Sequence, residues 1–86
     1  MYQMWIHHHS DRDGKHSSLF AVEKSIEALR KRLIDQLRIP EHYWGFGQKS
    51  RLTITKVGFS EIVEVVHVID YCRAIGIYLH SDNGVN

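Results

Sequence analysis

Residues 50–77 read SRLTITKVGFSEIVEVVHVIDYCRAIGI, and the way this stretch folds decides the class of the protein. Its second half predicts a helix capped by Ser60 and ending near Gly76, because apolar residues recur there at spacings of three and four. These apolar residues are Ile62, Val65, Val66, Ile69, Cys72 and Ile75. Residues 51–59 allow two interpretations. Their β-branched residues alternate with a period of two, as in a strand, whereas Ser50 is a good N-cap for a short helix.

A longer helix is expected upstream of this stretch. Ser17 or Ser18 can serve as its N-cap, and Pro40 should end it around Arg38, since the residue before a proline is pushed away from helical angles. Between these limits apolar residues fall near helical spacing on one face, namely Phe20, Ile26, Leu29, Leu33 and Leu37. Residues 41–44 can form one further helical turn before two glycines break the regular structure.

The first 17 residues, MYQMWIHHHSDRDGKHS, show no apolar period and are rich in His, Asp, Ser and Gly. We interpret residues 1–17 as a flexible tail, residues 18–80 as a single domain and residues 81–86 as a frayed end. The expected fold class is therefore all-α, a small helical bundle with a flexible N-terminal tail. The alternative is an α+β fold, if residues 51–59 form a strand.

Length and composition limit the classes of protein that remain. With 86 residues, of which 43% are hydrophobic, the chain can bury one compact core. Cys72 is the only cysteine, so we expect a small buried hydrophobe and a reducing, cytoplasmic setting. No leader sequence is recognised, and the longest apolar run is far shorter than the roughly 20 residues that cross a bilayer. We therefore expect neither export nor a membrane-spanning segment.

Charge is distributed unevenly, although the net charge is only +1. Residues 30–56 hold seven basic and two acidic side chains, a balance of +5, whereas the segments before and after them sum to −1 and −3. A local basic excess is typical of a surface that binds a polyanion, because neutralised phosphates release counterions. The other interpretation is a solvated basic face without a ligand.

The segment SRLTITKV, a polar break at residues 58–60 and the stretch DYCRAIG together resemble the lambda-repressor-like helix-turn-helix family, also called the Xre or Cro family. The resemblance covers roughly residues 28–77 and is most specific over residues 50–77. It implies a recognition helix over residues 50–57 and sequence-specific binding of double-stranded DNA, as in a transcriptional repressor or a phage or plasmid regulator. Such proteins commonly bind half-sites as dimers, so a homodimer is among the expected partners.

The same resemblance assigns roles to individual residues. Ser50, Arg51, Thr53 and Thr55 would approach base edges in the major groove, where an arginine can make a bidentate contact with guanine. Basic side chains would hold phosphates, which supplies affinity without sequence information. These phosphate contacts are Arg30, Lys31, Arg32, Lys49 and Lys56. No cofactor, metal, small-molecule substrate or catalytic residue is expected.

Three further interpretations concern the histidine-rich segment and the apolar residues of the C-terminal half. The segment IHHHSDRDGKHSS resembles a motif of insertion-sequence transposases with an integrase-type core, in which Asp11 would match a catalytic aspartate. The same histidines can bind metal adventitiously or belong to a tag. A protein-interaction module without DNA contact, dimerising through the apolar residues 62, 65, 66 and 69, is the main alternative function. Nothing predicts an enzyme, because no nucleophile motif accompanies the serines and histidines.

Overall fold

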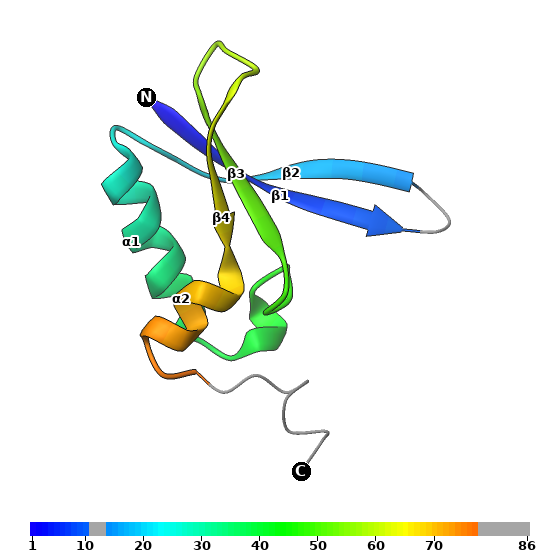
Figure 1. Cartoon of the computed structure of the whole chain (residues 1–86), viewed down its shortest axis with the longest axis vertical. Coiled ribbons are helices and arrows are strands. Elements are labelled where there is room, and N and C mark those ends of the chain that lie inside the picture. Colours follow the sequence, from blue (N-terminus) through cyan, green and yellow to red (C-terminus); the bar gives the residue numbers. More distant parts are fainter. Residues whose placement is uncertain (11–13, 78–86) are drawn as a thin grey trace.

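The computed structural model describes residues 1–10 and 14–77, without the side chains of residues 9 and 10. In this part of the chain an antiparallel sheet of four strands, in the order β2-β1-β3-β4, carries its helices on one side (Figure 1). The elements in chain order are β1 (Tyr2–Ser10), β2 (Gly14–Glu23), α1 (Ile26–Leu37), the 3-10 turn η1 (Glu41–Tyr43), β3 (Arg51–Lys56), β4 (Ile62–His67) and α2 (Val68–Ala74).

The expectation of an all-α bundle with a helix-turn-helix is wrong, and the α+β alternative is the observed fold. Residues 51–56, expected as a recognition helix, form the inner strand β3, which pairs with both β1 and β4. The helix expected from Ser60 is divided: residues 62–67 form β4 and only residues 68–74 are helical. Valine and isoleucine at spacings of three and four satisfy both patterns, and their β-branched side chains suit a pleated sheet. Pairing with β3 therefore decides the outcome.

The flexible N-terminal tail expected over residues 1–17 is also wrong. Residues 2–10 form β1, a central strand of the sheet, and residues 14–17 begin β2. Met4 and Ile6 explain this outcome, because their side chains are buried in the core at 0% and 7% exposure. Hydrophobic burial of two alternate side chains, together with ladders on both edges of β1, orders the segment.

Helix α1 begins later than expected and ends where expected. Its N-cap is Ser25, not Ser17 or Ser18, and the Ser25 hydroxyl accepts a hydrogen bond from the Ala28 backbone N–H at 3.1 Å. The preceding residues are drawn into β2 by pairing with β1. The helix ends at Leu37 with Arg38 as its C-cap, as the proline predicted, and the expected turn at residues 41–44 is η1.

The core lies between the sheet and its helices. Leu29, Leu33 and Leu37 form the buried stripe of α1, which packs on β1 and β2, while α2 contributes Val68 and Cys72. Cys72 is fully buried, which confirms its expected role as a small hydrophobe, and burial raises the pKa of its thiol.

An ion pair joins α1 to the outer strand β4. The Arg30 guanidinium donates to both carboxylate oxygens of Glu64, with Nε at 3.3 Å from Oε2. This hydrogen bond with Glu64, more than any other interaction, raises the pKa of Arg30. Because both side chains are partly exposed, the pair adds little stability, but it fixes the direction of the arginine side chain.

Among the helices of residues 1–10 and 14–77, none has both the length and the apolar character needed to cross a membrane. The longest, α1, has 12 residues and carries charged side chains along its exposed side. The sequence-based expectation that no helix of the chain spans a bilayer is confirmed for the described residues.

Candidate functional site

One side of the sheet is covered and the other is not. Alternation along the strands directs Met4, Ile6, Leu52 and Ile54 toward the helices, and within the described residues no helix lies over the opposite side (Figure 1). We call this opposite side the open face. The register of the ladders places on it Gln3, Trp5, His7, Ser17, Leu19, Arg51, Thr53, Thr55, Ile62 and Val65.

Hydrogen bonds between neighbouring strands of the open face fix two ring side chains. The Trp5 indole N–H donates to the Thr55 hydroxyl at 2.9 Å. The His7 ring is held on both sides: its Nε2 lies 2.7 Å from the Thr53 hydroxyl and its Nδ1 lies 2.9 Å from the Ser17 hydroxyl. Both rings are therefore anchored to neighbouring strands, which lowers the entropy lost when a ligand contacts them.

An apolar hollow of about 620 Å³ lies on the open face near the β3–β4 turn. Phe59 at its rim is 64% exposed and Ile62 is 53% exposed, so the hollow presents apolar side chains to the solvent. The Lys56 ammonium lies 5.7 Å from the centre of the Phe59 ring, within reach of a cation–π interaction. The side chains that line the hollow are those of Trp5, His7, Ser17, Thr53, Thr55, Phe59, Ser60 and Ile62, beside Gly58.

A second hollow of about 420 Å³, which we call the basic notch, lies where the β1–β2 hairpin extends past β3. β1 pairs with β3 only from Tyr2 to Ile6 but with β2 as far as Ser10, so the end of the hairpin projects from the sheet (Figure 1). The notch lies beside this overhang, against the start of β3. Its lining residues are His7, His8, Lys15, His16, Ser17, Lys49, Ser50 and Arg51.

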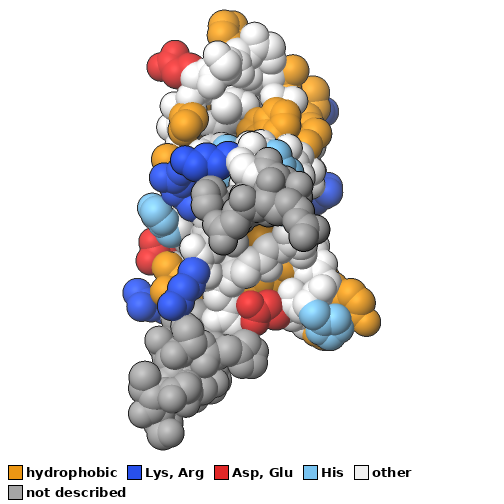
Figure 2. Space-filling model, turned by 90° about the vertical axis from the view of Figure 1, so that its right-hand side faces the viewer, with side chains coloured by type: hydrophobic (Ala, Val, Ile, Leu, Met, Phe, Trp, Pro, Cys, Tyr) orange, Lys and Arg blue, Asp and Glu red, His pale blue; other side chains and the backbone are white. Residues whose placement is uncertain are grey.

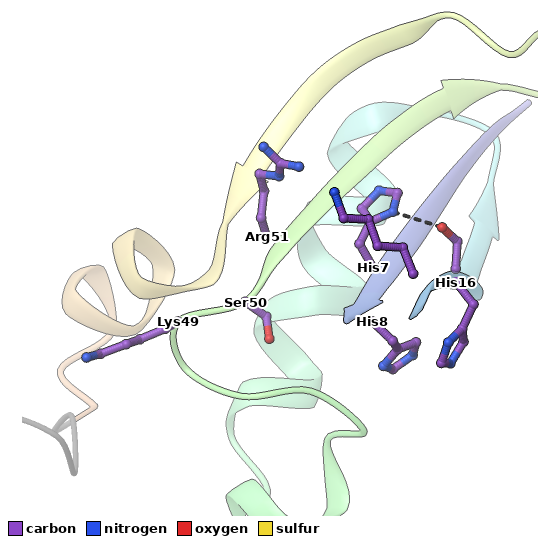
Figure 3. Close-up of a pocket in the computed structure, with 8 residues that line it drawn as sticks. His7, His8, His16, Lys49, Ser50 and Arg51 are labelled. Atoms are coloured by element: carbon purple, nitrogen blue, oxygen red, sulfur yellow. Dashed lines mark hydrogen bonds between the residues drawn. The ribbon is translucent and has the colours of Figure 1, made fainter. Parts of the chain in front are cut away.

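Positive and hydrogen-bonding groups dominate the basic notch. His8 and His16 stack with ring centres 4.7 Å apart, whereas Arg51 points from β3 away from this pair, and the Lys49 side chain also extends away from the histidines (Figure 3). No Asp or Glu is among the described residues that line it. Such a set of groups attracts an anion.

The two hollows adjoin one another, because His7 and Ser17 line both. Seen from the hairpin end, Lys, Arg and His side chains lie across the middle of the molecule and hydrophobic side chains gather above them, toward the β3–β4 turn (Figure 2). A site that suits an anion thus lies next to an aromatic and apolar site. A nucleotide unit combines the two matching chemistries in one molecule.

The structure separates the residues expected to contact DNA into three places. Lys49, Ser50 and Arg51 meet at the basic notch, and Lys56 lies at the edge of the apolar hollow. Thr53 and Thr55 are 3% and 7% exposed and their hydroxyls bond to His7 and Trp5, so they support the open face from within. The remaining residues, Arg30, Lys31 and Arg32, lie on α1 in the helical layer.

Two of the α1 residues have other partners. Arg30 is bound to Glu64, and the Arg32 guanidinium donates to the Glu23 carboxylate at 2.8 Å. Their positive charge is therefore largely balanced locally. The basic excess of residues 30–56 does not form one surface, since its members are divided between the helical layer and the notch.

Sequence reasoning gave no nucleic-acid role to several residues that line the two hollows, among them Trp5, His7, Lys15 and Phe59. The sequence did contain a signal that would have placed Trp5, His7 and Lys15 in a β-hairpin. Asp13-Gly14 stands between two runs of strand length, and an Asp-Gly pair is typical of a tight hairpin turn. Gly14 indeed has a φ of 77°, a conformation that favours glycine.

Comparisons with protein-family models, curated proteins and solved structures found no match to this chain. The resemblances to the lambda-repressor-like family and to transposases therefore stay predictions, although the helical framework implied by the first is not the observed one. The function has to be inferred from the geometry of the open face.

Proposed function

We propose that this protein binds single-stranded nucleic acid across the open face of its sheet. One observation carries the proposal: the part of the basic notch that lies on the open face, with Lys15 and Arg51, adjoins the aromatic hollow, and His7 and Ser17 line both. In this arrangement a phosphate occupies the notch and the neighbouring base occupies the hollow. Sheet faces with exposed aromatic side chains are a common platform for unpaired bases.

The apolar hollow supplies the contacts for a base. Trp5 is held in place by its bond to Thr55, and Phe59 is exposed at the rim. Stacking of a base on an aromatic side chain contributes about 1–3 kcal/mol and tolerates any sequence, because every base has a π face. Binding through this hollow is therefore expected to depend weakly on sequence.

The basic notch supplies the contacts for the backbone. Lys15 and Arg51 lie on the same face as the hollow, and Lys49 extends the positive charge along its edge. Arginine and lysine bind phosphate with charge-assisted hydrogen bonds, and neutralising phosphates makes the affinity depend on salt.

Single strands suit this surface better than a duplex. A base can reach the hollow only when it is unstacked and turned outward, as in a single strand or a loop. Duplex binding through a recognition helix would need residues 50–57 to be helical, and residues 51–56 form the strand β3. Double-stranded DNA, sequence preference and a regulatory role stay predictions from the sequence. A cytoplasmic location, expected from the single cysteine, agrees with this proposal.

The test is a fluorescence-anisotropy titration with labelled 12-mers, single-stranded DNA and RNA against the matching duplexes, at 50 and 200 mM salt. We expect the single strands to bind more tightly than the duplexes. The logarithm of their association constant should fall linearly with the logarithm of salt concentration, with a slope of about −0.7 for each phosphate that the protein neutralises. Tighter binding of the duplexes, or absence of binding at 50 mM salt, would refute the proposal.

The alternative function is protein interaction without nucleic acid, and the exposure of β4 favours it in part. Ile62 and Val65 are 53% and 43% exposed on this outer strand, so they can contact a second copy. Val66 and Ile69, expected in the same interface, instead pack in or against the core. Absence of nucleic-acid binding in the titration, together with a dimer in sedimentation analysis, would favour this function.

A further inference from the structure

The basic notch holds more positive charge and more donors than one internal phosphodiester requires. A phosphodiester within a strand carries a single negative charge and is bonded to sugars on both sides. The notch offers two cations on the open face, Lys15 and Arg51, beside the His7 ring, while His8 and His16 line it from the other side of the hairpin. The excess matches a phosphate monoester, which carries about −1.5 to −2 charges and three acceptor oxygens at pH 7.

A hydroxyl on the open face adds a further polar group to the notch. Ser17, which bonds to His7 Nδ1, lies where the notch meets the apolar hollow. The Ser50 hydroxyl, by contrast, accepts a hydrogen bond from the Gly47 backbone N–H at 2.9 Å and points away from Arg51 (Figure 3). Arg51 has the planar fork that binds two phosphate oxygens at once.

The position of the notch also suits the end of a strand. It lies at the projecting end of the hairpin, the apolar hollow lies on the side of the β3–β4 turn, and His7 and Ser17 line both. A terminal nucleotide can place its phosphate in the notch and its base in the hollow. The rest of the strand can then continue past the β3–β4 turn.

We propose that the basic notch binds a terminal phosphate monoester of a nucleic-acid strand, so that the protein prefers phosphorylated strand ends. This inference rests on the proposed binding of single strands and specifies which part of the strand the notch contacts. The 5′ and the 3′ phosphate share the chemistry described above, and the experiment distinguishes them.

The experiment compares one 8-mer RNA, labelled internally, in three forms: with both ends unphosphorylated, with a 5′ phosphate and with a 3′ phosphate. One phosphorylated form is expected to bind at least about tenfold more tightly than the unphosphorylated form, which corresponds to roughly 1.4 kcal/mol. Inorganic phosphate should compete with that form at lower concentrations than chloride does.

Two variants separate this inference from the proposed function. In Lys15→Gln/Arg51→Gln the ratio between phosphorylated and unphosphorylated strands should fall toward one. Lys56 lies outside the notch. In Lys56→Gln the affinities for phosphorylated and unphosphorylated strands should therefore fall by the same factor, and their ratio should stay unchanged. Equal affinity of all three forms for the parent protein overturns the inference while the single-strand proposal stands. Failure of all three forms to bind overturns both.

Discussion

Replacing Lys15 and Arg51 with glutamate is expected to weaken the binding of single-stranded nucleic acid by roughly 100-fold at 100 mM salt. Hydrogen bonds to charged groups contribute about 1.5–3 kcal/mol each, so the loss of two such contacts is worth about 3 kcal/mol. Both residues lie on the open face and both line the basic notch. They are exposed, so the substitutions should leave the thermal unfolding midpoint nearly unchanged.

A matched control is available in the helical layer. Lys31→Glu/Arg38→Glu makes the same change of net charge with exposed residues of α1 and its C-cap. Anisotropy titrations at equal ionic strength should show less than a threefold loss for this variant, because the charges lie away from the notch. Equal losses in both variants would mean that binding responds only to net charge, and the notch would not be the site.

Leu33→Ala is expected to lower the free energy of unfolding by about 2–5 kcal/mol. Leu33 is fully buried in the middle of the α1 stripe that packs on β1 and β2, so the substitution removes apolar contact and leaves a cavity. A domain of this size has only about 5–15 kcal/mol in total, so much of the protein would unfold on mild heating. Urea denaturation followed by circular dichroism at 222 nm gives the value.

The same substitution at Leu19 is the control, since this leucine is 47% exposed on the open face. Leu19→Ala should cost less than about 1 kcal/mol, because most of its side chain is already in contact with water. If Leu19→Ala were as destabilising as Leu33→Ala, the open face would have to be covered in the folded protein, and the assignment of the two faces would be wrong.

Local signals predicted some elements well. Pro40 marked the end of α1, the apolar stripe through Leu33 marked its buried side, and Cys72 was assigned to the core. Each of these predictions depends on residues within a few positions of one another. Short-range spacing was sufficient because helix geometry is itself local.

The sheet could not be predicted in the same way. β1 and β3 pair although about fifty residues separate them in the sequence, for example Gln3 with Thr55, and no local pattern predicts this pairing. In β4 the same Val and Ile residues fit a helical stripe, so a helix was expected until the pairing with β3 was known. Pairing between distant segments decided between two patterns that the residues satisfy equally.

The candidate site was predicted only in part for the same reason. Lys49, Ser50 and Arg51 were singled out by charge and by resemblance, and they do line the basic notch. Trp5 and His7 were assigned to a flexible tail, so their place on the open face was missed. A site that is assembled in space from β1, β2 and β3 cannot be found by reading one segment at a time.

The most direct test of single-strand binding by the open face uses the two tryptophan indole N–H signals in ¹H–¹⁵N NMR spectra of the parent protein. Trp5 lines the apolar hollow, whereas Trp44 is buried and donates to the Ile39 carbonyl at 2.9 Å, so Trp5→Phe assigns the two signals. On titration with a single-stranded 8-mer, the Trp5 indole and the Thr53 and Phe59 amides should shift together. The Trp44 indole and the amides of α1 should stay in place. Shifts confined to α1, with the Trp5 signal unchanged at saturation, would contradict the proposed function.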